Sequence, residues 1–210
     1  MKNSNNKQKA LSLLSVKSMT IMAMLGAIAF VLMYFEIPLW FAPPFYELDF
    51  SEVPVLIGAF ALGPIAGIII ELIKILLFIV IKGTDTMGSG ELANFLIGCS
   101  MLVPAAIVYY RNKTLKSAIK GLIVGTVCMV FLGAFMNAFV LLPIYAYFFK
   151  MPIDALIGMG TQVNPAINGM STFIFYAVIP FNLLKGVVVS LITLLVYKRI
   201  SGVIKSIVEA

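Results

Sequence analysis

Long apolar runs with few charges constrain this chain more than any other feature of its sequence. Charged residues make up 11% of the 210 residues and hydrophobic residues 61%, whereas soluble domains carry about 25% charged residues. A chain with so little polar side-chain surface cannot cover itself against water, so lipid must surround most of it. The apolar runs are continuous rather than alternating, which favours helices over the strands of a membrane barrel. We therefore expect an all-α integral membrane protein.

A helix that spans the hydrocarbon core of a bilayer needs about 20 apolar residues. Four runs approach or exceed this length: 19–35, 87–110, 121–149 and 171–197. A further stretch, 53–81, is either one crossing with a flaw or two crossings, because Gly63-Pro64 interrupts it. Glycine can end a helix at positive φ, and proline is tolerated in the first turn of the next helix.

Basic residues decide between these two interpretations of 53–81. They gather in three clusters, which precede the first run, follow the run ending at 110, and follow the last run: Lys2, Lys7, Lys9 and Lys17; Arg111, Lys113, Lys116 and Lys120; Lys198, Arg199 and Lys205. Lys and Arg are enriched on the cytoplasmic side of membrane helices, and only two crossings within 53–81 place all three clusters there. We predict a bundle of six transmembrane helices over 19–198 in the cell membrane, with cytoplasmic segments at 1–18 and 199–210. The short second helix is expected to begin near Glu47.

The absence of histidine excludes several classes of function. Ser-His and Cys-His nucleophile pairs, HExxH zinc sites and histidine proton relays cannot form in a chain without histidine. The sequence also contains no GxxxxGK[ST] phosphate-binding loop. We therefore expect no enzymatic activity, no catalytic residues, no metal and no cofactor. The net charge of +6 lies mostly in the loop clusters, so it indicates membrane topology rather than a nucleic-acid partner.

Charged side chains inside the apolar runs are candidates for an internal site, because a charge at the bilayer centre costs about 2.5–3.5 kcal/mol on insertion scales. Lys185 lies inside the last run, with Asn182 three residues earlier on the same helix face. We interpret Lys185 as contacting a ligand or a partner. Glu71 and Lys74 are three residues apart, so they form either an ion pair within one helix or part of a site.

Three other polar residues in the runs have both a binding and a structural interpretation. Glu91 near the start of its run either lines a site or complements the positive end of the helix dipole. Asn94 and Asn137 lie on separate helices and either face a ligand or form hydrogen bonds between helices.

The loop at 36–52 is dense in aromatic and acidic residues. Aromatic residues at a membrane interface commonly anchor a helix end, but this density favours a lid that closes over a flat apolar ligand, with carboxylates at its polar edge. The residues assigned to this lid are Trp40, Phe41, Phe45, Tyr46 and Asp49.

Small residues four apart on the first helix, Ala23 and Ala27, permit close approach of another helix. That helix belongs either to the same chain or to a partner subunit.

Three segments resemble the riboflavin-specific substrate-binding (S) component of energy-coupling-factor (ECF) vitamin transporters. They are AMLGA in the first helix, LDFSEVPVLIGAFALGPIAGIIIELIK across the second and third, and PFNLLKG in the sixth. The resemblance extends over nearly the whole chain. It implies a vitamin pocket between the outer halves of the helices, capped by the loop after the first helix.

The resemblance also implies roles for particular residues. Asn182 and Lys185 would donate hydrogen bonds to riboflavin, and Asn94 and Asn137 would join them because of their helix positions. The stripe of small residues on the first helix would contact a transmembrane coupling subunit, which two cytoplasmic ATPases drive. The alternatives are an S component for thiamine, biotin or folate, and a structural membrane protein without a ligand.

Overall fold

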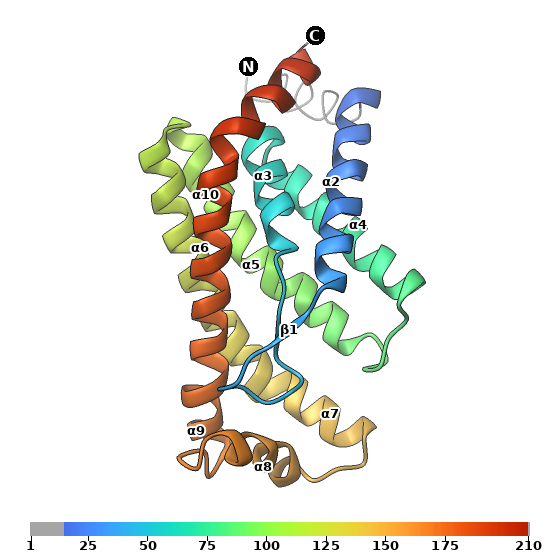
Figure 1. The fold of residues 1–210 in the computed structure, drawn as a ribbon, viewed down its shortest axis with the longest axis vertical. Helices are drawn as coiled ribbons and strands as arrows, with labels where there is room; N and C mark the ends of the chain where they lie inside the picture. Colours follow the sequence, from blue (N-terminus) through green and yellow to red (C-terminus); the bar gives the residue numbers. More distant parts are fainter. Residues whose placement is uncertain (1–14, 210) are drawn as a thin grey trace.

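The computed structural model describes residues 15–209, and these are almost entirely helical (Figure 1). The helices are α2 (Val16–Tyr34), α3 (Glu52–Leu62), α4 (Pro64–Ile81), α5 (Ser89–Asn112), α6 (Leu115–Met136), α7 (Leu142–Phe148), α8 (Ile153–Val163), α9 (Met170–Phe173) and α10 (Ile179–Glu209). Two π-helical segments, η1 (Asn137–Leu141) and η2 (Ile174–Val178), connect α6 to α7 and α9 to α10. The short strands β1 (Ile37–Pro38) and β2 (Glu47–Leu48) pair antiparallel in the loop after α2.

Within residues 15–209, six helical segments form the predicted bundle. Five of the helical segments in this described part are long and apolar enough to cross a membrane, namely α2, α4, α5, the rod from α6 to α7, and the rod from α9 into α10. The sixth, α3, has 11 residues, which is about 16 Å of helix against a hydrocarbon core of about 30 Å. All of its residues from Glu52 to Ala61 are buried, because α2, α4, α5 and α10 surround it. A helix too short to span a bilayer is therefore enclosed by protein.

The expectation that the second helix begins near Glu47 is wrong. Glu47 and Leu48 belong to β2, which pairs with β1, so the chain is extended there. Asp49 then accepts a hydrogen bond from the backbone N–H of Ser51 at 2.8 Å, and α3 begins at Glu52. The polar residues before 52 form a local turn that competes with the helix.

The Gly63-Pro64 step reverses the chain between α3 and α4, as the sequence predicts. Gly63 has φ 117° and ψ 166°, a region that is essentially restricted to glycine. Pro64 occupies the first turn of α4. The hydroxyl of Tyr110 donates to the carbonyl oxygen of Ala61 at 3.2 Å, which satisfies one acceptor at the end of α3.

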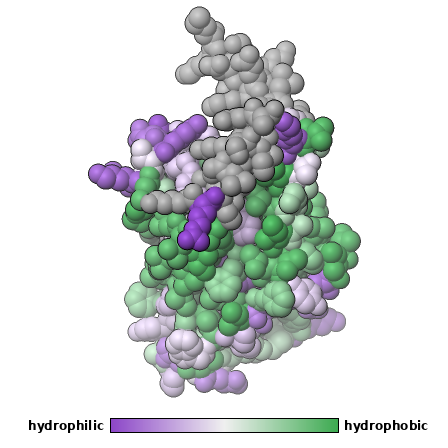
Figure 2. Space-filling view, turned by 45° about the horizontal axis from the view of Figure 1, so that its top comes forward, coloured by the Kyte–Doolittle hydropathy of each residue, from purple (hydrophilic) through white to green (hydrophobic). Residues whose placement is uncertain are grey.

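Figure 1 places the start of α2, the turn between α5 and α6 and the end of α10 at one end of the bundle, and the loop with β1, together with α7 to α9, towards the other. Two of the predicted basic clusters and Lys17 of the third therefore share one end, while Lys2, Lys7 and Lys9 lie outside the described residues. Figure 2 shows hydrophobic side chains over the flank between the more hydrophilic ends. This pattern fits a protein that crosses a bilayer.

The shared end yields a prediction about sidedness. We expect a cysteine introduced at Lys113, in a chain whose Cys99 and Cys128 are replaced by alanine, to react with a membrane-impermeant thiol reagent only after the cells are opened. Asp85→Cys, in the turn between α4 and α5, is the control and should react in intact cells. Reaction of the residue 113 cysteine in intact cells would invert the orientation.

Candidate functional site

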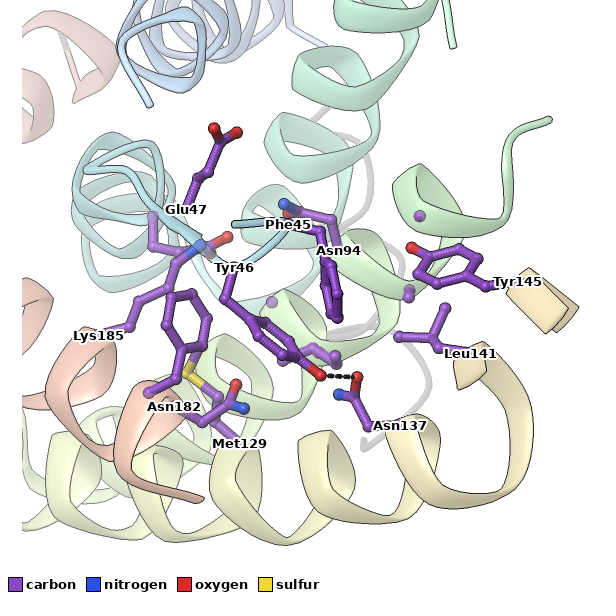
Figure 3. A pocket seen from close by; sticks show the side chains of 16 residues that line it. Phe45, Tyr46, Glu47, Asn94, Met129, Asn137, Leu141, Tyr145, Asn182 and Lys185 are labelled. Carbon is purple, nitrogen blue, oxygen red and sulfur yellow. Dashed lines mark hydrogen bonds between the residues drawn. The ribbon is translucent and has the colours of Figure 1, made fainter. Parts of the chain in front are cut away.

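A cavity of about 140 Å³ lies between the loop after α2 and the helices α5, α6 and α10 (Figure 3). Six of the residues expected to form a site line it: Phe45, Tyr46, Asn94, Asn137, Asn182 and Lys185. They come from the loop and from three helical rods that are distant in sequence. The rest of the lining is mainly apolar, with Met129, Leu141 and Phe181 among its residues.

The other four expected site residues do not line this cavity. Trp40 is 85% exposed. Phe41 is half-buried and packs in a cluster with residues of α7 to α10. Glu91 is buried at the start of α5, where it accepts a hydrogen bond from the Thr86 hydroxyl at 2.9 Å. Asp49 is buried and binds Lys185.

Tyr46 connects the loop to the bundle (Figure 3). Its hydroxyl donates to Asn137 Oδ1 at 2.5 Å, and its ring lies 5.1 Å from the ring of Phe181 and 6.2 Å from that of Phe173, measured between centroids. Burial raises the pKa of the Tyr46 hydroxyl well above its usual value, so the hydroxyl remains a proton donor. The loop is therefore held against α6 and α10 by one hydrogen bond and by aromatic packing.

Both π-helical segments stand next to a cavity amide. Asn137 is the first residue of η1, and Asn182 follows η2 by one turn. Their side-chain N–H groups donate to carbonyl oxygens on their own helices, Gly133 at 2.8 Å and Val178 at 2.9 Å. Their side-chain carbonyl oxygens remain as acceptors, and Tyr46 uses that of Asn137.

A proline accompanies both π-helical segments in the sequence. Each segment ends two residues before a proline, since η1 ends at Leu141 before Pro143 and η2 ends at Val178 before Pro180. Proline lacks an N–H and clashes with the carbonyl of the preceding turn. A wider turn relieves this clash, and π-bulges are frequent at functional sites.

A buried ion pair joins the loop to α10. Lys185 Nζ lies 2.7 Å from Asp49 Oδ2, and both side chains are buried. Burial alone would raise the pKa of Asp49, but the charges of Lys185 and Lys74, together with the hydrogen bonds from Lys185 and Ser51, outweigh it and lower the pKa to about 2. Both residues were expected in the site, but their pairing was not.

A second buried cluster surrounds Lys74 and extends the ion pair expected within α4. Lys74 Nζ lies 2.7 Å from Glu71 Oε1 and 2.8 Å from Glu52 Oε1. It also donates to Asn94 Oδ1 and Ser51 Oγ, each at 3.2 Å. Glu52 and Asn94 line the cavity, so this cluster forms part of its wall. Sequence reasoning placed Glu52 only at the end of the acidic loop at 36–52 and missed its role as a partner of Lys74.

The outer face of α2 carries the two small residues singled out in the sequence. Ala23 and Ala27 are exposed. Close packing of α2 within the bundle is instead made by Gly26, where an added Cβ would lie 2.6 Å from Ile73 Cγ2. The two alanines are therefore accessible for contact with a helix that is not among the described residues.

Comparison with known proteins identifies relatives over almost the full chain. The family described as ECF transporter, substrate-specific component matches residues 17–197. The chain is 38% identical to the riboflavin transporter RibU of Staphylococcus aureus (strain TCH60) over 96% of this chain and 100% of that protein. It is 31% identical to the riboflavin transporter FmnP of Bacillus subtilis (strain 168), over 89% and 93% of the two proteins. A solved structure described as the S component of a bacterial ECF transporter aligns with a TM-score of 0.69 at 37% identity, covering 89% of this chain and 96% of that one.

The buried ion pair yields a stability prediction. Asp49→Asn removes the charge that compensates Lys185, and breaking a buried pair in this way should lower the free energy of unfolding by about 3 kcal/mol. The control is Glu36→Gln, because the pair between Glu36 and Lys82 is partly exposed and should contribute less than about 1 kcal/mol. Thermal unfolding in detergent measures the loss of stability in each variant, and equal losses in the two variants would contradict the prediction.

Proposed function

Because the chain belongs to the family of ECF transporter substrate-specific components, we propose that it captures riboflavin outside the cell and delivers it inward with an ATP-driven ECF coupling module. The chain is a multi-pass membrane protein and a transporter component rather than an enzyme. The relatives named above are riboflavin transporters, which favours riboflavin over thiamine, biotin or folate. The alternative hypothesis, a structural membrane protein without a ligand, does not explain why several polar side chains line one cavity.

The convergence of three amides on one cavity carries this proposal. Asn94, Asn137 and Asn182 come from three helical rods and line the same apolar space. Riboflavin combines a flat, largely apolar ring system with polar ring edges and a hydroxylated ribityl chain. Amide groups both donate and accept hydrogen bonds, so three of them in an aromatic pocket suit such a ligand. Lys185 adds a charged donor beside Asn182.

The size of the cavity supports a lid function for the loop. Ligand sites usually enclose about 300–1,000 Å³, and this cavity has about 140 Å³. The side chains of Phe45 and Tyr46 fill part of the space between the rods (Figure 3). We infer that the loop, with Trp40, Phe41 and Asp49 on it, moves outward to admit riboflavin and that Tyr46 then releases Asn137. Glu91, at the start of α5, does not line the cavity and is not among the residues that we propose to contact riboflavin.

The orientation and the partners are part of the same proposal. The end with the basic residues is cytoplasmic, so residues 1–18 and 199–210 face the cytoplasm and flank the transmembrane domain at 19–198, although residues 1–14 lie outside the described chain. Structurally, α10 continues past residue 198 to Glu209. Exposed Ala23 and Ala27 offer a smooth surface for a transmembrane coupling subunit, which two cytoplasmic ATPases would drive.

Riboflavin binding tests the first part of the proposal. Detergent-purified protein should quench riboflavin fluorescence on titration with an affinity in the nanomolar range. Asn182→Leu should weaken the affinity about tenfold to hundredfold, because a lost hydrogen bond to a polar ligand costs about 1–3 kcal/mol. Asn112→Leu is the matched control, because Asn112 is exposed at the far end of α5.

Two outcomes would contradict riboflavin as the ligand. One is the absence of quenching in folded protein that retains thiamine, biotin or folate, as detected by mass spectrometry of the purified protein. The other is an equal loss of affinity in the Asn182→Leu and Asn112→Leu variants.

Substitution on the outer face of α2 tests the coupling surface. Ala27→Trp should leave riboflavin affinity unchanged, because Ala27 does not contact the cavity, but should reduce riboflavin uptake by flavin-starved cells at least about tenfold by blocking close helix approach. Val127→Trp on the exposed face of α6 is the control. Unimpaired uptake by the Ala27→Trp variant would remove this surface from the proposal.

A further inference from the structure

The buried ionic groups beside the cavity do not balance in charge. Asp49, Glu52 and Glu71 supply three carboxylates, whereas Lys74 and Lys185 supply two ammonium groups, and all five side chains are buried. With every group ionised, this part of the described chain holds one excess negative charge. An uncompensated charge in a low-dielectric interior is strongly unfavourable. Asp49 is matched by Lys185, so the excess lies with the cluster around Lys74.

The geometry at Lys74 assigns the excess to one carboxylate. A lysine ammonium has three N–H donors, and Lys74 uses them for Ser51 Oγ, Glu52 Oε1 and Asn94 Oδ1. Glu71 Oε1 is the fourth oxygen near this nitrogen, at 2.7 Å, so four oxygens surround three N–H donors. Glu71 Oε2 has no hydrogen-bond partner among the described residues, although Glu71 is fully buried.

The two carboxylates of this cluster also approach one another. A Cβ added to Gly98 would lie 2.7 Å from Glu71 Oε1 and 2.9 Å from Glu52 Oε1, so both side chains converge on the same point of α5. Within residues 15–209, Glu52 Oε2 also has no hydrogen-bond partner. Two carboxylates that share a buried site disfavour each other's ionisation, and the glycine at 98 provides the space for both.

We propose that Glu71 is a proton-binding site and holds one proton at neutral pH as a constituent of the folded protein. The proton makes the buried set of five groups neutral. It also gives the cluster a fourth donor, so that an oxygen that accepted nothing can take part in a hydrogen bond. Glu52 is the ionised partner of Lys74. Because Glu52 and Asn94 line the cavity, the proton site lies directly behind its wall.

The groups that face Glu71 come from each neighbouring segment. They are Lys74 on its own helix, Glu52 on α3, Asn94 and Cys99 on α5, and Asp49 and Lys185 farther along the same buried set. Glu71→Gln preserves the shape of a protonated glutamate without its ability to titrate. Glu52→Gln removes the charge that Lys74 requires. We therefore expect Glu71→Gln to change the stability little and Glu52→Gln to lower it.

Infrared spectroscopy of the wild-type protein in detergent at neutral pH tests the proton directly. We expect the carbonyl stretch of a protonated carboxylic acid, shifted in D₂O, and its loss in Glu71→Gln. Glu91→Gln is the matched control, because Glu91 is buried on α5 but accepts a hydrogen bond from Thr86, and should retain the band. Absence of the band from wild-type protein, or its persistence in Glu71→Gln, would overturn the proposal.

Thermal unfolding locates the proton on Glu71 rather than Glu52. At neutral pH the Glu71→Gln variant should melt close to the wild type and the Glu52→Gln variant well below it; the reverse order would overturn the assignment. In the unfolded chain Glu71 is ionised at neutral pH, so the folded state binds one more proton and loses stability as pH rises. The unfolding constant of the wild type should therefore increase relative to that of Glu71→Gln by up to about tenfold per pH unit.

A bound cation is the alternative occupant. Stability that rises with sodium but not with choline at fixed pH, and only when Glu71 is present, would assign the position to a metal ion and overturn the proposal. None of these measurements requires riboflavin, so their outcome is separate from that of the binding experiment.

Discussion

The pairing of two lysines with carboxylates from one short segment is the interaction on which this structure depends. Asp49 binds Lys185 of α10, and three residues later Glu52 binds Lys74 of α4. Both lysines are buried within the bundle, and a charge at membrane depth is costly unless it is paired, so each requires its partner. The segment between the two carboxylates is therefore fixed between two helices, and α3 starts from it. The two ion pairs at the start of α3 therefore fix the position of this helix, which is too short to span the membrane.

The same pairing determines what the cavity offers to a ligand. The charges of Lys74 and Lys185 are both balanced by carboxylates. The polar groups of the cavity wall are the amides of three helices together with Glu47, Glu52 and Lys185. Such a wall suits a neutral molecule with several hydrogen-bonding groups. Tyr46, on the loop, donates a hydrogen bond to one of these amides, that of Asn137. The closed loop therefore uses a polar group that a ligand would also use.

Much of the fold followed from the sequence because lipid restricts the possibilities. Apolar runs had to be helices, and Gly63-Pro64 had to break one of them. Polar residues at membrane depth had to face inwards, which brought Asn94, Asn137, Asn182 and Lys185 to one cavity. The partner of Lys185 was not predictable, because Asp49 is 136 residues away and no sequence pattern relates the register of a loop to that of a distant helix. The exposure of Trp40 was not predictable either, because an irregular loop has no regular alternation of buried and exposed residues.

The length of α10 has a mechanical consequence. The helix runs unbroken for 31 residues from Ile179 to Glu209, about 47 Å at 1.5 Å per residue. It carries Asn182 and Lys185 within its first two turns. One end of this helix therefore lines the cavity, and its other end extends beyond the opposite end of the bundle. A tilt of about 10° at the cavity would displace the far end by about 8 Å. Small rearrangements around a ligand are thereby magnified at a distance.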